Sequence, residues 1–335
     1  MTGARFDPTL HDVARLAGVS HTTVSLALKN DSRITPNTRG KVLEAARSLG
    51  YVPNETARGL VRYRTGTLAL VSDSFSSAYE AELLRGIESA MRHNHPEFAL
   101  VQYSTGGREA RSEEIHRRIL RSNAADAVIC LAEPPSPSVI LAYQQSQKPF
   151  VLFAENVEGA SWVHCDGKLG AQLATQALLE AGCYNPGIVT SSFQNGQPHC
   201  DPERWGVFQK LCLDSGVVPH TFEIELLDFS SGKSLAARIP REVDGIFCAA
   251  GDLVAIGLLA GFRERGIQVP QDMKLVGYDG LDVSSLVSPG LTTVAQPLED
   301  MGRQAVQFCF SLLSNFESSG LSRLFEPILL RRGST

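Results

Sequence analysis

The chain has 335 residues, with 31 Lys and Arg against 36 Asp and Glu, and this length predicts two or three domains. No apolar run approaches the length of a membrane span, the first eight residues are too polar for a secretory signal, and the seven scattered cysteines argue against a disulfide framework or a zinc site. We expect a cytoplasmic protein without metal or cofactor. The charge is unevenly divided, because residues 1–65 carry +5 and residues 66–335 carry −10. A basic segment on an acidic body indicates an anionic partner, and nucleic acid is the first candidate.

Three short helices are predicted in the first fifty residues. Thr9 begins the first helix with a capping box, and Gly18 ends it. Ser20 caps a second helix only two residues later, which runs from residue 21 to about residue 28. A third helix follows, with Thr35 as its cap. Two helices joined by a three-residue turn that contains Gly indicate a helix-turn-helix.

The second helix is predicted to present polar side chains outward, because Val24, Ala27 and Leu28 face inward. His and Thr can hydrogen-bond base edges in the major groove, and an exposed Leu can contact a thymine methyl group. The spacing alone leaves open a small helical bundle that does not bind DNA. We predict base contacts from His21, Thr22, Ser25 and Leu26, and phosphate contacts from Ser20, Thr23, Arg33, Thr35, Thr38 and Arg39.

A fourth, very short helix is predicted after Pro53. Asn54 can cap it, and its pattern extends to about residue 62. Eight or nine residues are too few to hold a helix alone in water. We therefore expect this segment to need a partner for its stability.

Separated sequence blocks in this region carry a resemblance to the LacI/GalR family of bacterial transcription regulators. The blocks are Thr9-Leu-His-Asp-Val-Ala-Arg-Leu-Ala-Gly-Val-Ser-His-Thr-Thr-Val-Ser25, Arg33-Ile-Thr-Pro-Asn-Thr-Arg39 and Gly50-Tyr-Val-Pro-Asn-Glu-Thr-Ala-Arg-Gly-Leu60. The resemblance implies that His21 and Thr22 read bases, and that Leu26 occupies a further base-reading position where many members carry Arg. It also implies that residues 54–65 form a hinge helix and linker. In that helix Leu60 wedges into the minor groove, with Ala57 packing nearby and Arg58 near the DNA backbone. Thr9, Tyr51 and Asn54 complete the predicted DNA-binding set.

From residue 66 onward, short apolar runs alternate with longer helical patterns. This alternation predicts parallel sheets covered on both faces, which bind ligands beyond the carboxyl ends of their strands. The chain lacks glycine-rich phosphate loops and a nucleophile elbow, so the sequence signals no enzyme. The predicted strands are 67–71, 98–103, 127–131, 150–153, 162–165, 187–190, 222–227, 245–248 and 274–278.

The family resemblance continues through this body, at Val163–Asp166, Arg204–Phe208, Pro270–Asp279 and Leu291–Pro297. It implies two α/β subdomains of the periplasmic-binding-protein type, joined by three crossings, with an effector between them. A sugar or sugar derivative is the first expectation, ahead of a purine or another metabolite. The effector contacts that the resemblance implies are Tyr79, Arg204, Phe229 and Asp252, with Glu155 substituting for an acidic position of the family.

The sequence therefore predicts an effector-controlled transcription repressor that binds double-stranded operator DNA as a homodimer, with a tetramer left open, and that is associated with the nucleoid when bound. The predicted fold is an all-α helix-turn-helix head followed by an α/β effector domain of two parallel-sheet subdomains. Two alternatives are a sugar-binding protein without DNA-regulatory activity and an α/β enzyme. The predicted boundaries are 1–53 for the head, 54–65 for the hinge and 66–335 for the effector-binding and dimerisation domain. Within that domain, about 66–160 and 296–325 form the N-subdomain, and about 161–295 and 326–335 form the C-subdomain.

Overall fold

The computed structural model describes residues 8–28, 31–51, 64–154, 157–194, 197–198, 202–316 and 320–335. The chain divides into two compact units, Met1–Thr65 and Gly66–Thr335. Most of the predicted hinge segment lies outside the described residues. The same is true of five predicted site residues, which are Asn54, Ala57, Arg58, Leu60 and Glu155.

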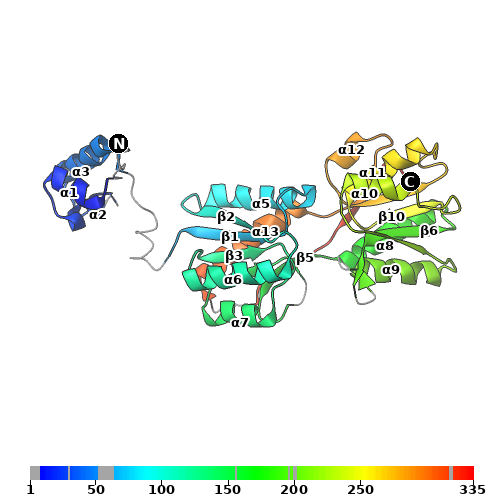
Figure 1. Cartoon of the computed structure of the whole chain (residues 1–335), viewed down its shortest axis with the longest axis horizontal. Coiled ribbons are helices and arrows are strands. Elements are labelled where there is room, and N and C mark those ends of the chain that lie inside the picture. The colour runs from blue at the N-terminus through cyan, green and yellow to red at the C-terminus, as the bar shows by residue number, and fades with distance from the viewer. Residues whose placement is uncertain are drawn as a thin grey trace, which may run out of the picture. The chain divides into compact units, whose positions relative to one another are not determined.

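The first unit contains the three predicted helices, α1 (Leu10–Ala17), α2 (His21–Leu28) and α3 (Pro36–Leu49) (Figure 1). The capping box of α1 is present, because the Thr9 amide donates to the Asp12 carboxylate at 2.9 Å and the Asp12 amide donates to the Thr9 hydroxyl at 3.4 Å. Gly18 ends α1 with a φ of +65°, a conformation that favours glycine. The helices enclose a small core of Val13, Ala14, Val24, Ala27, Val42, Ala45 and Ala46.

The second unit contains two six-stranded sheets. In the first sheet the strand order is β13-β5-β4-β3-β1-β2, and every pair is parallel. The residues of β1 and β3 are almost all buried, as expected for central strands of a parallel sheet. The bounds are β1 (Thr67–Ser72), β2 (Ala99–Ser104), β3 (Ala127–Cys130), β4 (Phe150–Leu152), β5 (Ser161–Cys165) and β13 (Ser322–Phe325).

The second sheet has the order β14-β12-β11-β10-β6-β9. Its pairs are parallel except for β14, which runs antiparallel to β12. The bounds are β6 (Pro186–Ser191), β9 (His220–Ile224), β10 (Gly245–Cys248), β11 (Lys274–Asp279), β12 (Thr292–Ala295) and β14 (Ile328–Leu330), and a separate two-stranded ribbon consists of β7 (Phe193–Gln194) and β8 (Gln197–Pro198).

Helices cover both faces of each sheet (Figure 1). On the first sheet, α5 (Ala78–Asn94) and α13 (Leu298–Ser314) share one apolar core with the strands, and α6 (Glu109–Ser122) and α7 (Pro137–Gln145) share the other. The two-layer cover explains why the central strands are apolar along their whole length. On the second sheet the covering helices are α8 (Gly167–Glu180) and α9 (Pro202–Asp214) on one face, and α10 (Phe229–Ala236) and α11 (Asp252–Glu264) on the other, followed by the short α12 (Val283–Leu286).

Helices α5 and α13 approach each other closely because glycines line their contact. A Cβ atom placed on Gly86 of α5 would lie 2.0 Å from the Glu299 carbonyl oxygen. A Cβ atom on Gly302 of α13 would lie 2.3 Å from the Leu83 carbonyl oxygen. The backbones of the two helices therefore touch, and no larger residue fits at either position without separating them.

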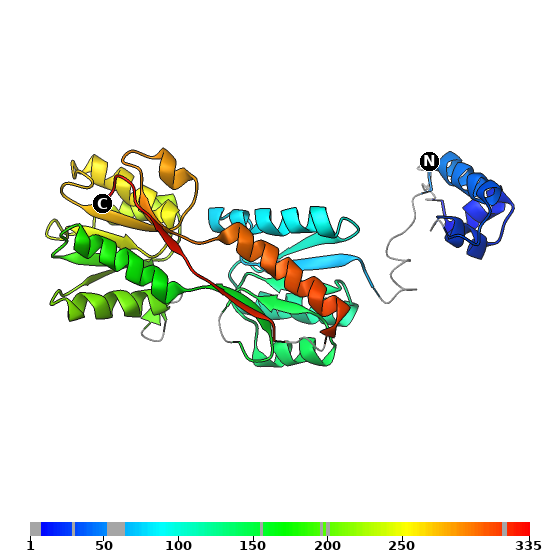
Figure 2. The ribbon, with the colours of Figure 1, turned by 180° about the vertical axis from the view of Figure 1, so that it is seen from behind.

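The chain passes between the two sheets three times, after β5, after β12 and after β13. Figure 2 shows the last crossing as the red segment that runs from β13 in one subdomain to β14 in the other. The first and last crossings are joined by a hydrogen bond of 2.8 Å from the Asp166 amide to the Phe325 carbonyl. The predicted boundary at about 160/161 needs correction, because β5 (Ser161–Cys165) pairs with β4 and β13 in the first sheet and therefore belongs to the N-subdomain.

Candidate DNA-binding head and effector site

Helix α2 presents a polar, partly exposed surface at its beginning. The Ser20 hydroxyl caps the helix by accepting a hydrogen bond of 3.1 Å from the Thr23 amide, and it lies 2.9 Å from the Thr23 hydroxyl. His21 and Thr22 are exposed, whereas Ser25 and Leu26 are half-buried. Leu26 is absent from the core of the head, so its side chain contributes to the surface. The first turn of α2 therefore offers a hydrogen-bonding surface of the kind that enters a major groove.

Two arginines that we predicted as phosphate contacts stabilise the turn before α3. Arg33 donates two hydrogen bonds to the Asp31 carboxylate, at 2.9 and 2.8 Å, and this pairing lowers the pKa of Asp31. Arg39 donates to the carbonyl oxygens of Asp31 and Ile34, at 2.7 and 3.3 Å. Arg33 remains mostly exposed, so its outer edge can still meet a phosphate. Arg39 is half-buried, and its main role is to hold the turn.

The remaining predicted contacts of the head also have local structural roles. The Thr35 hydroxyl caps α3 by accepting from the Thr38 amide at 3.3 Å, and the two hydroxyls lie 2.9 Å apart. Thr9 caps α1, as described above, and Tyr51 packs against the core of the head. His21 and Thr22 have no such capping role: the Thr22 hydroxyl lies 3.4 Å from His21 Nδ1, and the His21 ring packs edge-on against His11.

In the second unit, a cluster of side chains gathers where strands of both sheets end. The Arg204 guanidinium of α9 lies over the ring of Tyr278, with its carbon 3.5 Å from the ring centre. Its Nη1 donates to the Ala249 carbonyl at 3.0 Å, directly after β10. Asp279 ends β11 with a φ of +105°, and its carboxylate accepts a hydrogen bond of 3.0 Å from the Gln296 amide. A non-glycine residue in that backbone region is strained, which is typical of functional sites.

Tyr79 brings the N-subdomain into this cluster. Burial raises the pKa of its phenol, the charge of Asp279 raises it further, and the charge of Arg204 acts in the opposite direction. Leu281, directly after the Asp279 turn, packs in the same apolar core as Tyr79 and its neighbours on α5. The site therefore combines a phenol from one subdomain with a cation and an anion from the other.

Asp252 does not take the predicted position in this cluster. Its side chain is completely buried, and its carboxylate accepts from the Thr293 hydroxyl at 2.6 Å and from the Leu281 amide at 2.8 Å. Burial raises its pKa to about 7, and the nearby charge of Asp279 adds to the rise. The prediction that Asp252 contacts the effector is therefore corrected: this carboxyl positions the turn that carries Asp279.

Glycines make room for this arrangement. A Cβ atom on Gly277 would lie 2.3 Å from the Asp252 carboxylate, and one on Gly251 would lie 2.8 Å from the Asp279 carboxylate. Gly251 also has a φ of +105°, which lets the chain turn sharply between β10 and α11. Small residues at these two positions allow the two carboxyl groups to occupy adjacent places.

Phe229 begins α10 instead of lying in the loop before it. The Asp228 carboxylate caps this helix by accepting from the Ser231 amide at 2.7 Å. The Phe229 ring is 42% exposed, and none of the described contacts joins it to Tyr79, Arg204 or Asp279. Its role at the effector site therefore stays a prediction.

Sequence reasoning missed two members of the cluster, Asp279 and Gln296. Both belong to segments that carried the family resemblance, and both lie at the carboxyl ends of paired parallel strands, because Asp279 ends β11 and Gln296 follows β12. Because ligands bind beyond the carboxyl ends of such strands, the position of these two polar residues was a usable signal.

Two family models match the chain. Residues 9–54 match the model described as bacterial regulatory proteins of the lacI family, and residues 175–335 match the periplasmic binding protein-like domain. The head therefore carries a LacI-family DNA-binding domain, and the second half of the chain carries a periplasmic binding protein-like domain. The LacI-family repressor CytR of Escherichia coli is 28% identical over 98% of this chain and 96% of its own length.

Solved structures of LacI-family members share the fold. A transcriptional regulator from Silicibacter pomeroyi superimposes with a TM-score of 0.84 at 24% identity, over 98% of this chain and 99% of that chain. A regulator from Enterococcus faecalis, solved with bound ribose, superimposes with a TM-score of 0.71 at 26% identity, over 80% of this chain and 98% of that chain. These likenesses confirm the predicted fold class, a helix-turn-helix head with a two-subdomain α/β domain.

The described residues include neither a membrane-spanning helix nor a cluster of metal ligands. None of their helices is long and apolar enough to cross a membrane. Among the same residues, no group of three or more His, Cys, Asp or Glu is arranged to hold a metal ion.

Proposed function

We propose that this chain is a sequence-specific DNA-binding transcription regulator, a repressor, whose DNA binding is controlled by a small polar effector held between the two subdomains. The observation that carries this proposal is the pairing of two features in one chain. One is a helix-turn-helix with His21 and Thr22 exposed on α2. The other is the polar cluster of Tyr79, Arg204 and Asp279, drawn from both subdomains.

The chemistry of the cluster favours a sugar or a closely related metabolite. The Asp279 carboxylate and the Gln296 amide accept or donate hydrogen bonds to hydroxyl groups, and the Arg204 guanidinium donates in a planar fork. The phenol of Tyr79 adds a polar group and an aromatic face. The relative from Enterococcus faecalis was solved with bound ribose, which supports a carbohydrate effector here.

A ligand that contacts both subdomains can control DNA binding by changing how they close on each other. Tyr79 belongs to α5 of the first sheet's subdomain, whereas Arg204 and Asp279 belong to the other subdomain. Such a ligand stabilises the closed arrangement only to the extent that it binds that arrangement more tightly than the open one. We infer that closure is transmitted through the three crossings toward the DNA-binding head.

The finer features of the regulator rest on the family. We propose a homodimer on a pseudo-palindromic operator, because two-fold symmetry in a protein dimer matches two half-sites on DNA. A regulator of chromosomal genes acts in the cytoplasm, on the nucleoid. The hinge role of residues 54–65 stays a prediction from the sequence.

The decisive experiment selects duplex DNA from a random library with the full chain and measures affinity for the enriched site by fluorescence anisotropy. His21→Ala and Thr22→Ala should each weaken binding by about tenfold, in line with the discrimination that a good base contact provides. Leu43→Ala, an exposed apolar position on α3, serves as the matched control. Selection of no sequence, or equal binding by all four proteins, would refute the DNA-binding assignment.

A second measurement tests the effector. A thermal-shift screen of pentoses, hexoses and nucleosides should reveal a stabilising ligand, because a molecule that binds only the folded chain raises the melting temperature. The same ligand should change operator affinity. Chemical turnover of that ligand by the pure chain would instead support the enzyme alternative.

A further inference from the structure

A small acidic pocket lies in the N-subdomain, between the first turns of α6 and the loop that follows β3. Its volume is about 130 Å³, which is the share of about four water molecules in the liquid. The described residues that line it include none of the effector cluster. Its charged side chains are four carboxylates and one guanidinium, those of Asp73, Glu109, Glu113, Glu133 and Arg108.

Three lining residues of α6 share one face of the helix, because Glu109, Ser112 and Glu113 are three or four residues apart. The fold uses the Glu113 carboxylate, which accepts a hydrogen bond of 2.7 Å from the Ser136 amide and one of 3.1 Å from Arg117. The Glu109 carboxylate is exposed and forms no hydrogen bond or ion pair with the other described residues. It is therefore available to a ligand.

The Ser112 hydroxyl is the second group of this pocket that the fold leaves without use. The residue is only 7% exposed, and its Oγ has no hydrogen-bond partner among the described residues. Ser122 of the same helix shows the usual solution, because its hydroxyl donates to the Arg118 carbonyl at 2.7 Å. A buried hydroxyl without a partner is unfavourable and rare in folded chains. Because Ser112 lines the pocket, its hydroxyl can meet a ligand there.

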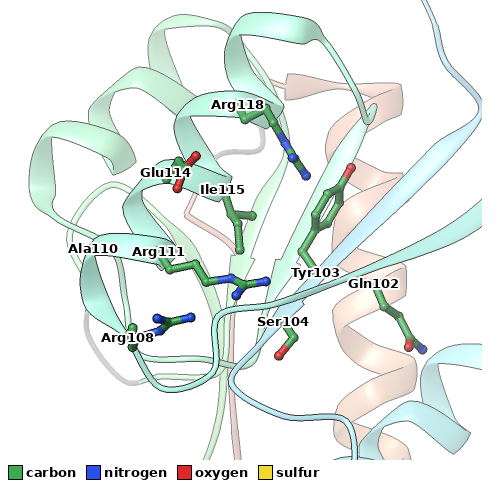
Figure 3. A pocket seen from close by; sticks show the side chains of 9 residues that line it. All are labelled: Gln102, Tyr103, Ser104, Arg108, Ala110, Arg111, Glu114, Ile115 and Arg118. Atoms are coloured by element: carbon green, nitrogen blue, oxygen red, sulfur yellow. The ribbon is translucent and has the colours of Figure 1, made fainter.

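The charge of the pocket stays negative after the neighbouring positive charges are counted. Arg117 offsets the charge of Glu113, and Arg108 offsets that of one further carboxylate. The start of the α6 dipole adds about half a positive charge. Figure 3 shows the Arg108 guanidinium beside that of Arg111, a residue that lines the other, β2 side of the helix. The four carboxylates outweigh these contributions, so the pocket attracts a cation.

We propose that this pocket binds a small primary amine in its ammonium form, held by the Glu109 carboxylate and the Ser112 hydroxyl. An ammonium group donates three hydrogen bonds, so it can use a carboxylate and a hydroxyl at the same time. A metal ion is a poorer match, because no group of three or more His, Cys, Asp or Glu among the described residues is arranged to hold one. The volume leaves room for about three carbon atoms beside the nitrogen. The proposal stands independently of the proposed function, because the two sites share no residue.

Isothermal titration calorimetry on the full chain at low, constant ionic strength tests the proposal, because salt screens exposed charges. The probes are the chlorides of propylammonium, tetramethylammonium and calcium, together with neutral propanol. We expect propylammonium to bind at least about tenfold more tightly than tetramethylammonium, which carries the same charge but has no N–H donor. Calcium and propanol should not bind.

Ser112→Ala separates a binding role from a structural one. The variant should bind propylammonium about tenfold more weakly, because it removes an acceptor from a charged donor. Without ligand its melting temperature should equal or exceed that of the wild type, because the hydroxyl that it removes has no partner among the described residues.

Glu109→Gln should also weaken the binding by about tenfold, because it removes the charge of the available carboxylate. The matched control is Glu114→Gln, which removes the same charge from the same helix. Glu114 lines the β2 side of α6, with Arg111 and Arg118 (Figure 3), so this variant should bind propylammonium as the wild type does.

Four results would overturn the proposal. Equal binding of propylammonium and tetramethylammonium would show that charge alone attracts them. Unchanged affinity in Ser112→Ala, or an equal loss in Glu109→Gln and Glu114→Gln, would place the amine elsewhere. A lower melting temperature of unliganded Ser112→Ala would show that the hydroxyl serves the fold. Tighter binding of calcium than of propylammonium would assign the pocket to a metal ion.

Discussion

The Thr293 hydroxyl donates a hydrogen bond of 2.6 Å to the Asp252 carboxylate. This contact joins strand β12 to the first turn of helix α11. The second oxygen of the same carboxylate accepts a hydrogen bond from the Leu281 amide, which follows β11. Three successive chain segments of the second sheet thus meet at one buried group. These hydrogen bonds to Asp252 hold the turn that presents Asp279. A change at Asp252 should therefore also change the effector site.

Asp252→Ala tests the positioning role of this carboxyl. The substitution leaves the Thr293 hydroxyl and the Leu281 amide buried without their acceptor, so we expect the free energy of unfolding to fall by about 3 kcal/mol. Effector affinity should fall as well, because Asp279 loses its support. Urea denaturation and effector titration measure the two effects. A variant with wild-type stability that no longer binds effector would show that Asp252 contacts the effector directly.

Asp279→Asn tests the direct contact. We expect effector affinity to fall by about tenfold or more, because hydrogen bonds to a charged acceptor are stronger than those to a neutral amide. Operator affinity without effector should stay within about twofold of wild type, since the head is unchanged. The exposed neighbour Asp282 provides the control variant Asp282→Asn. Equal responses of the two variants would exclude Asp279 as the contact.

His116 makes the stability of the N-subdomain depend on pH. The ring is fully buried, and its Nδ1 lies 3.0 Å from the Tyr143 hydroxyl. Burial lowers its pKa to about 4, so the unfolded chain binds this proton more readily than the folded chain. Stability should therefore fall as the pH drops from about 6.5 toward 4, by about 3 kcal/mol from this group. Urea denaturation at several pH values measures the slope.

The control for this measurement is His116→Asn, which keeps a hydrogen-bonding group toward Tyr143 but does not titrate. The variant should show a shallower loss of stability on acidification than the wild type. The comparison of slopes matters because Asp252 acts in the opposite direction. Its raised pKa means that its contribution to stability decreases as the pH rises from about 4 to about 7. Parallel curves for the wild type and the variant would show that His116 does not titrate as described.

Gly86→Ala tests the close packing of α5 on α13. The added methyl group would lie 2.0 Å from the Glu299 carbonyl, so the helices must separate, and we expect a loss of about 3 kcal/mol in the free energy of unfolding. Gly206→Ala on α9 is the matched control, because nothing lies within 4 Å of its Cβ position. That variant should be neutral or more stable by up to about 1 kcal/mol. Chemical denaturation of both variants decides the point.

Much of the fold could be predicted from the sequence because its signals are local. The capping residues Thr9 and Thr35 and the terminating Gly18 act within one helix turn, and the structure confirms all three. Each of the nine predicted strands is present, and the central ones, such as β1 and β3, are short runs of mostly apolar, buried residues. Strands β7, β8, β12, β13 and β14 were not predicted. Among them, β13 (Ser322–Phe325) is an edge strand whose side chains are mostly exposed.

Other features depend on contacts that the sequence does not display. A strand at Trp162–Cys165 was predicted, but its pattern does not reveal which of two similar sheets it joins. The pairing of β5 with β13 decides this. Asp252 and Asp279 both lie near the carboxyl ends of strands of the second sheet, and a carboxylate at such a place can point into the protein or out of it. The partners that distinguish the two carboxylates lie far along the chain: Thr293 donates to Asp252, and Gln296 donates to Asp279.

The alternation of the chain between its two sheets also constrains how the protein is made. Strand β13 completes the first sheet and strand β14 completes the second, and both belong to the last fifteen residues or so of the chain. A nascent polypeptide can fold its three-helix head as soon as that segment leaves the ribosome. Neither α/β subdomain can close its edge until the segment that contains β13 and β14 has been synthesised. The head is therefore available to DNA before the part that controls it, and the interval between the two is set by the speed of synthesis.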